Sequence, residues 1–320
     1  MVCLLLTAVR TLQPWSPPQP LHSLTLEEVN LELARFKGQR GVAPEASPSE
    51  NVFNPFGKAA SSLSAALAFS MMQSGQGGEE WARVAGRMQA KRLAKERGTR
   101  PAALTEWHDP GALLFPLLST HPFHEPDDPW WCDRVSEAVA LLEHFYPVIR
   151  DEALSLRQGA SGASLPLYRD HGDALLHENG QWKVHYVELE GKDTSAAREK
   201  TPKIAAIVDA IARRSSHSFL SVLEPGTHIL PHCGPSNYRL RLQLGLSVPG
   251  EKCRIRVGDQ TRAWVAGKCL VIDDAFEHEV WNDTDEERII LIVDIWHPDF
   301  SDAEVRWMEE TRAAKFRKRG

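Results

Sequence analysis

Ten residues in the second half of the chain alternate strictly between apolar and polar side chains. One face carries only leucines and a valine, and the other carries Arg239, Arg241, Gln243, Gly245 and Ser247. This two-residue period is that of a β-strand with one buried face. The polar face either meets water, as in a surface strand, or points inward. It holds two arginines and an amide, with no lysine and no acidic partner, and this favours an inward face.

A second segment, residues 288–296, is almost wholly apolar after its first residue. Such a run is expected of a strand that is buried on both faces. Arg288 opens the run, and a buried arginine needs an anion. No carboxylate of the sequence is obviously assigned to it, so the anion of a ligand is a candidate.

Turn sequences divide the region from Ser218 to Trp296 into short segments. Glu224-Pro-Gly-Thr227 and Pro249-Gly-Glu-Lys252 are typical tight turns. We expect roughly six to eight short strands at this spacing, which is the pattern of a sandwich or barrel. The fold class predicted is α+β, a double-stranded β-helix (a jelly-roll or cupin-like barrel) with flanking helices.

Two histidines, His232 and His278, lie 46 positions apart within this strand region. Imidazole is a good ligand for iron, zinc, copper and nickel, and the usual site for non-haem Fe(II) has two histidines and one carboxylate. That carboxylate normally stands two residues after the first histidine, where this chain has Gly234. The residues alone therefore leave two alternatives, an iron site with two protein ligands or a site that does not hold iron.

Other residues near the pair could complete it. Asp273, Asp274 and Glu277 are close to His278 in sequence, although acidic groups in turns usually stay in solvent. His228 precedes His232 by four residues, so strand alternation would put both on one face. Cys233 is not expected to be a ligand, because adjacent strand residues point to opposite faces.

At these residues the chain strongly resembles the aspartyl/asparaginyl β-hydroxylase family of Fe(II)- and 2-oxoglutarate-dependent oxygenases. The matching segments are residues 224–237, 239–246, 272–282 and 293–298, in that order. The resemblance covers about residues 130–300 and is weaker in the first half of that range. Members of the family hold iron with two histidines and no carboxylate, so Gly234 fits the resemblance.

The resemblance implies a role for each matching residue. His232 and His278 would be the metal ligands for Fe(II), and His232, His278 and Arg288 would form the catalytic set. Ser221 and Arg288 would hold the distal carboxylate of the co-substrate, 2-oxoglutarate. Arg241 and Gln243 would bind near its iron-chelating end or bind a substrate carboxylate, and Trp182 would line the same site.

The chain departs from the family pattern at Gln243, where the family usually has histidine. Glutamine donates a hydrogen bond but carries no charge. We therefore expect anion binding to survive in weakened form, with a shift in substrate or pH preference. This departure keeps a second hypothesis open, a non-catalytic jelly-roll that binds a ligand or protein. A third is a cupin-like barrel that binds zinc or copper.

The resemblance also bears on the acceptor of the reaction. A hydroxylase of this family is expected to act on the β-carbon of Asp or Asn residues in a protein or peptide, or on a lipid or other small molecule. The formal net charge of −6 gives no general attraction to nucleic acid. No apolar run reaches the roughly 18 residues of a membrane span.

Three regions are expected along the chain: an N-terminal extension over 1–125, a catalytic domain over 126–300 and a C-terminal helix over 301–320. Helices are predicted from Thr25 to Lys37, where Thr25 and Glu28 form a capping box, and over 79–96, 132–145, 148–157 and 203–214. The first 26 residues contain no acidic residue, which weakly permits a targeting peptide in an otherwise soluble protein of unknown compartment. Cys253 and Cys269 either pair or stay reduced.

Overall fold

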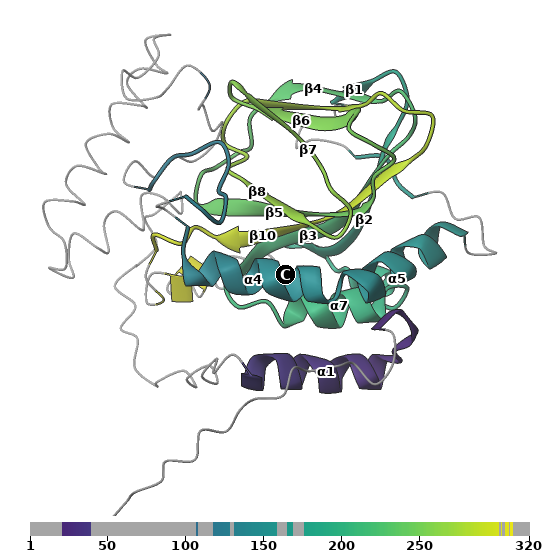
Figure 1. Cartoon of the computed structure of the whole chain (residues 1–320), viewed down its shortest axis with the longest axis vertical. Helices are drawn as coiled ribbons and strands as arrows, with labels where there is room; N and C mark the ends of the chain where they lie inside the picture. Colours follow the sequence, from purple (N-terminus) through teal and green to yellow (C-terminus); the bar gives the residue numbers. More distant parts are fainter. Residues whose placement is uncertain are drawn as a thin grey trace, which may run out of the picture.

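The computed structural model describes residues 21–39, 107, 118–128, 131–158, 165–168, 176–300 and five positions between 302 and 309. Two five-stranded antiparallel sheets face each other in this part of the chain (Figure 1). The small sheet has the order β1-β4-β9-β6-β7, and the large sheet has the order β2-β3-β10-β5-β8. Their strands are β1 His177–Glu178, β2 Trp182–Leu189, β3 Arg214–Leu223, β4 His228–His232, β5 Arg239–Ser247, β6 Cys253–Val257, β7 Gln260–Ala263, β8 Cys269–Ile272, β9 His278–Asn282 and β10 Arg288–Trp296.

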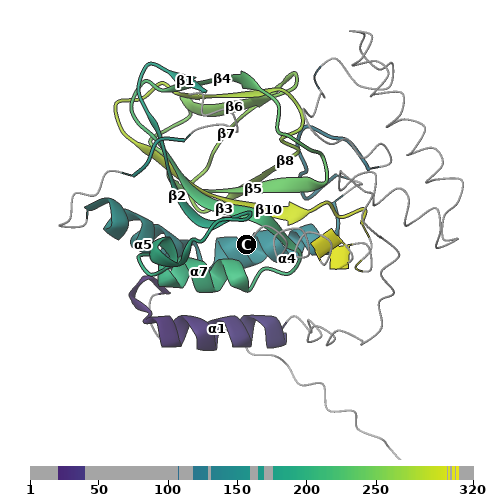
Figure 2. The same ribbon diagram turned by 180° about the vertical axis from the view of Figure 1, so that it is seen from behind.

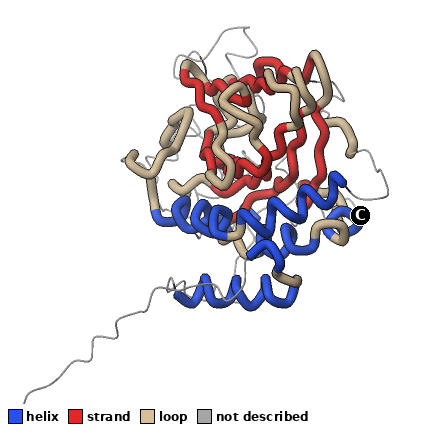
Figure 3. The backbone as a smooth tube through the Cα atoms, turned by 45° about the vertical axis from the view of Figure 1, so that its right-hand side comes forward, coloured by secondary structure: helices blue, strands red, loops and turns tan. Residues whose placement is uncertain are grey.

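The helices cover the outer face of the large sheet, as the view from behind in Figure 2 also shows. They are η1 Leu21–Ser23, α1 Leu26–Gln39, α4 Asp133–His144, α5 Tyr146–Gln158, α6 Ser195–Arg198 and α7 Pro202–Asp209. In Figure 3 the helices lie to one side of the strands, with α1 farthest from them. This architecture is the predicted α+β double-stranded β-helix with flanking helices.

Two apolar clusters hold the layers together, one on each face of the large sheet. The leucines at 240, 242, 244 and 246 on β5 pack against the helices. Residues from both sheets fill the second cluster inside the barrel, among them Phe219, Trp264 and Ile290. All nine residues of β10 are buried, so the predicted two-sided burial of this strand is confirmed. Since the leucine face of β5 packs against the helices, the polar face of β5 points into the barrel.

The predicted start of α1 is confirmed, but the predicted end of α7 is wrong. Thr25 and Glu28 form the expected capping box, because the Thr25 backbone N–H donates to Glu28 Oε2 over 2.8 Å and the Glu28 N–H donates to Thr25 Oγ1 over 3.3 Å. The helix predicted over 203–214 was wrong at its end: α7 stops at Asp209 and β3 begins at Arg214. Arg213, in a left-handed conformation with φ of 60°, turns the chain between them.

Some expectations fall on parts of the chain that are not described, including the helix over 79–96 and most of the C-terminal helix. Strand β2 was not predicted. The described cysteines at 132, 233, 253 and 269 are free thiols, so Cys253 and Cys269 do not pair. Among the residues that the structure describes, no helix is both long and apolar enough to cross a membrane.

Candidate active site

The two candidate metal ligands meet on neighbouring strands of the small sheet. His232 on β4 is paired in register with His278 on β9. Their ring centroids are 4.2 Å apart, and the ring planes are inclined by 52°. The structure therefore brings together two histidines that the sequence separates by four strands and their connecting loops.

Both imidazole rings are held by a backbone carbonyl two residues earlier in the chain. His232 Nδ1 lies 2.8 Å from Leu230 O, and His278 Nδ1 lies 2.9 Å from Phe276 O. A carbonyl oxygen only accepts, so Nδ1 carries the proton in each ring and Nε2 keeps its lone pair. Burial is the main cause that lowers the pKa of His278 to about 3, and burial also lowers the pKa of His232. Both rings are therefore neutral at physiological pH, and each can donate the lone pair of Nε2 to a metal ion.

A bulge in β4 aims His232 into the barrel. The pairing of β4 with β9 advances three residues on β4, from Ile229 to His232, but only two on β9, from Val280 to His278. Bulges of this kind redirect a side chain near functional sites. The expectation that His228 and His232 share one face is therefore wrong.

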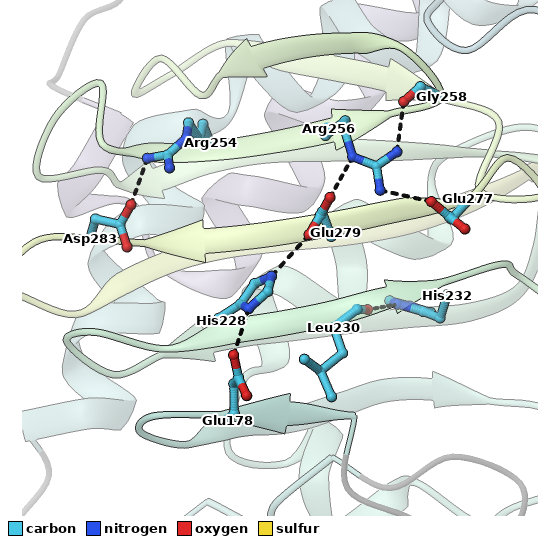
Figure 4. A network of polar contacts seen from close by, with 10 residues as sticks. All are labelled: Glu178, His228, Leu230, His232, Arg254, Arg256, Gly258, Glu277, Glu279 and Asp283. Atoms are coloured by element: carbon cyan, nitrogen blue, oxygen red, sulfur yellow. Dashed lines mark hydrogen bonds and ion pairs between the residues drawn. The ribbon is translucent and has the colours of Figure 1, made fainter. Parts of the chain in front are cut away.

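His228 lies on the outer face of the small sheet. Its two ring nitrogens contact Glu178 Oε1 and Glu279 Oε2 at 3.0 Å each (Figure 4). Its ring also stacks on Trp281. This environment is a surface network of charges and gives His228 a structural role.

The three acidic residues considered as further ligands have different environments. The suggestion that Glu277 could be a further ligand is wrong. Its Oε1 accepts a hydrogen bond from Arg256 Nη2 over 2.8 Å on the outer face of the small sheet (Figure 4). Asp273 Oδ1 accepts from the Ala275 backbone N–H in a turn, over 2.9 Å. Asp274 is buried close to the histidine pair and pairs with arginines.

Asp274 fills the space in which a side chain at position 234 would stand. A Cβ atom added to Gly234 would lie 2.6 Å from Cγ of Asp274 and 2.8 Å from its backbone oxygen. A carboxylate at position 234 therefore has no room. No group of three or more His, Cys, Asp or Glu side chains is arranged to hold a metal ion within the described residues.

Two buried carboxylates neutralise the arginines of β5. Asp294 on β10 accepts two hydrogen bonds from Arg241, over 2.8 and 3.0 Å. Asp274 Oδ2 lies 3.1 Å from both Arg239 Nη2 and Arg241 Nη1. Burial disfavours the charged guanidinium of Arg241, but Asp274 and Asp294 outweigh it and raise its pKa. The expectation that this polar face has no acidic partner is therefore wrong, because the partners come from distant parts of the chain.

Arg288 has no such counter-ion. It is 1% exposed, and its side chain makes no hydrogen bond with any described residue; its Nε atom is fully buried without a partner. Burial lowers its pKa to about 9, and the nearest aromatic group, Trp264, lies with its ring centroid 4.8 Å from the guanidinium carbon. A buried cation without an anion is the strongest sign of an anion site in the described structure.

Ser221 and Trp182 lie on the same inner face as Arg288. Trp182 on β2 donates its indole N–H to Ser221 Oγ over 2.9 Å, and its ring stacks on Tyr168 with centroids 3.7 Å apart. Ser221 opposes Ile290 across the β3–β10 pair, while Arg288 opposes Leu223 two residues along. Since such diagonal neighbours are within reach of a long side chain, one ligand could contact both.

Trp264, which the sequence did not single out, contacts two of the candidate residues. Its indole N–H donates to Gln243 Oε1 over 3.0 Å, and Arg288 lies over its ring. The one available signal was Gly245, an interruption of the polar face of β5 that leaves room for the segment around Trp264. The acid Asp294 was also missed, because it stands in an otherwise apolar strand.

Two facing antiparallel sheets, with a histidine pair on one and an unpaired arginine on the other, define a double-stranded β-helix protein of the jelly-roll and cupin-like class. The model of the aspartyl/asparaginyl beta-hydroxylase family matches residues 143–298. An ornithine lipid ester-linked acyl 2-hydroxylase of Rhizobium tropici is 34% identical over 213 residues, or 62% of this chain and 71% of that protein. The chain belongs to the aspartyl/asparaginyl β-hydroxylase family.

The mouse (Mus musculus) aspartyl/asparaginyl beta-hydroxylase is 40% identical over 180 residues, which are 54% of this chain and 24% of that protein. The matched region thus spans about a quarter of the length of that relative. A solved prolyl-4-hydroxylase of Pseudomonas putida superimposes with a TM-score of 0.30 and 14% identity, over 48% of this chain and 87% of that one.

Proposed function

We propose that this protein is an Fe(II)- and 2-oxoglutarate-dependent dioxygenase that hydroxylates a C–H bond. The observation that carries the proposal is the pair of neutral imidazoles with free Nε2 atoms on one sheet, together with the buried Arg288 that lacks a counter-ion on the other. The first feature suits a metal and the second suits a carboxylate. We also propose that residues 126–300 form the catalytic unit.

The donor set fits an iron ion. His232 and His278 would hold the metal through Nε2, because their Nδ1 atoms are fixed by backbone carbonyls. Imidazole suits iron, and two protein ligands leave several coordination positions for a bidentate co-substrate and oxygen. When bound, the iron would activate oxygen, and decarboxylation of 2-oxoglutarate to succinate and carbon dioxide would supply two electrons, so that one oxygen atom enters the substrate.

The other residues would bind and orient the co-substrate. Arg288 would pair with its distal carboxylate, since a guanidinium binds a carboxylate through two parallel hydrogen bonds. Ser221 accepts from Trp182, so its own hydroxyl proton is free to be donated to the same carboxylate. Trp182 and Tyr168 would exclude water from that side of the barrel.

Arg241 and Gln243 would bind closer to the metal. Arg241 uses three of its five N–H groups for Asp274 and Asp294. It therefore retains two donors for a carboxylate, but its charge is already balanced. This arrangement supports a role for Arg241 in positioning the co-substrate. It gives less support to tight binding of an acidic substrate by Arg241.

The acceptor that we propose is the β-carbon of an Asp or Asn residue in a protein or peptide. The support is similarity to the aspartyl/asparaginyl beta-hydroxylases, at 40% identity over 180 residues. A lipid is the second candidate. It is favoured by the Rhizobium tropici acyl 2-hydroxylase, because this chain covers 71% of that relative.

Anaerobic titration with Fe(II), followed by 2-oxoglutarate, tests the metal and co-substrate together. We expect one tightly bound iron and a visible charge-transfer absorption when 2-oxoglutarate is added. His232→Ala should lose both, and His228→Ala is the matched control, since that histidine lies on the outer face. Iron binding by His232→Ala that equals the wild type would contradict the assignment of the site.

Mass spectrometry of products tests the acceptor. Peptides containing Asp or Asn and an ornithine lipid are incubated separately with the iron-loaded enzyme and 2-oxoglutarate. A gain of one oxygen atom on the Asp or Asn residue supports the first candidate, and a gain on the acyl chain alone replaces it with the second.

A further inference from the structure

Trp264 contacts two residues on the anion-binding side of the barrel. It lies between β7 and β8, is 3% exposed, and donates its indole N–H to Gln243 Oε1 over 3.0 Å. The guanidinium carbon of Arg288 lies 4.8 Å from the centre of its ring. One rigid aromatic side chain thus touches an amide on β5 and a cation on β10.

The chain reaches this position because Gly245 has no side chain. A Cβ atom at Gly245 would lie 2.6 Å from the backbone oxygen of Val265. Instead, Gly245 forms a parallel bridge with Ala266, and its backbone oxygen accepts from the Gly267 N–H over 2.9 Å. These contacts fix the backbone on the C-terminal side of Trp264 against β5.

The hydrogen bond to Trp264 sets the orientation of the Gln243 amide. An indole N–H can only donate, so the amide atom that faces it must be the oxygen. The Gln243 side chain makes no other hydrogen bond with the described residues. Its NH2 group therefore points away from Trp264 with both protons available to a ligand.

The ring of Trp264 leaves Arg288 ready for an anion. A carboxylate partner would compete with a ligand for the guanidinium N–H groups, as Asp294 does for Arg241. An aromatic face attracts the cation without occupying its in-plane donors. Arg288 consequently has a fixed neighbour and free N–H groups.

We propose that Trp264 is a positioning residue that holds Gln243 and Arg288 as a single donor set for a linear dicarboxylate. This inference rests on the proposed function, in which 2-oxoglutarate is that dicarboxylate. Gln243 would then contribute a fixed neutral donor in place of the charge that histidine brings in the family.

The test is a double-mutant cycle on dicarboxylate affinity, measured calorimetrically with the full chain. Trp264→Phe keeps the ring beside Arg288 but removes the N–H, and Gln243→Met removes the amide. The two single variants and the double variant are each titrated with 2-oxoglutarate in the presence of Mn(II). They are also titrated, without metal, with glutarate, which has both carboxylates but no keto group.

We expect each single variant to bind glutarate about fivefold more weakly, the effect of one lost hydrogen bond. The double variant should be no weaker than either single variant, because Trp264 acts through the amide. Affinity for butyrate, a monocarboxylate that can use Arg288 alone, should change less than twofold. Trp281→Phe is the matched control, since Arg254 lies over that ring at the same 4.8 Å on the outer face.

Independent effects that multiply in the double variant, or Trp264→Phe affinities equal to the wild type, would overturn the inference. An equal loss for glutarate and butyrate would also overturn it, because it would show general damage to the fold. Failure of the proposed function is distinguished by the metal arm. Wild-type protein that does not bind Mn(II), and that binds 2-oxoglutarate no more tightly than glutarate, would retain the dicarboxylate site and lose the oxygenase.

Discussion

Replacing Arg288 by methionine should stabilise the ligand-free protein while abolishing dicarboxylate binding. Burial lowers the pKa of Arg288 from the ordinary value of an arginine to about 9. At about 1.4 kcal/mol per pKa unit, the uncompensated charge costs the folded state on the order of 4–5 kcal/mol. Loss of the favourable contact with the Trp264 ring offsets about 1–2 kcal/mol of this gain, so we expect a net stabilisation of about 2–4 kcal/mol.

The sign follows from proton linkage. The folded pKa is the lower one, so the unfolded chain binds the proton more tightly and the penalty is fully present at any pH below about 9. It disappears as the pH rises above about 9 toward the ordinary pKa of an arginine.

Urea denaturation at pH 7 measures this free energy of unfolding, with and without 2-oxoglutarate. A ligand present at 100 times its Kd should stabilise the wild type by about 2.7 kcal/mol, and it should leave Arg288→Met unchanged. Arg254→Met is the control: its arginine also lies over a tryptophan but is partly exposed and paired with Asp283. An Arg288→Met protein that is less stable than the wild type and still protected by 2-oxoglutarate would refute the reasoning.

Three further substitutions test the packing, the pH dependence and the helix capping of the fold. Gly234→Ala should destabilise the protein by about 1–3 kcal/mol in urea, because the new Cβ would stand 2.6 Å from Asp274 Cγ; an unchanged midpoint would contradict this packing. His124 is buried with both ring nitrogens unpaired, and burial lowers its pKa to about 3. As the pH falls below about 6.5, the His124 imidazole is therefore protonated in the unfolded state first, and the folded state loses stability. His124→Leu should reduce this loss of stability between about pH 6.5 and 4. Thermal melting measured as a function of pH would detect the change. Thr25→Ala removes the cap of α1 and should cost about 1 kcal/mol; faster amide exchange confined to the first turn of α1 is the expected signature, against equal exchange if the capping box to Glu28 contributes nothing.

The strands near the site were predictable because their pattern is local. The alternation over 239–248 and the apolar run over 288–296 each specify burial within a single segment. Strand β2 was missed because Trp182–Leu189, an edge strand of the large sheet, mixes charged and apolar side chains. The helix over 203–214 was overextended, since no sequence signal marks the left-handed turn at Arg213.

The parts of the site that could be predicted are those that depend on the type of one residue and its position in a strand. The histidine pair and the unpaired Arg288 follow from residue type and strand position. The inward turn of His232 depends on a bulge, which has no signal of its own in the sequence. The ion pairs of Arg241 join residues 53 and 33 positions apart, and such distant partners are fixed by the register of the sheets.

Succinate formation from 2-oxoglutarate tests the central claim most directly. The purified chain is supplied with Fe(II) and oxygen and compared with His278→Ala and with the outer-face control His228→Ala. The account predicts succinate from the wild type and the control, and none above background from His278→Ala. Equal succinate from His278→Ala would contradict the account, as would wild-type protein that binds no iron.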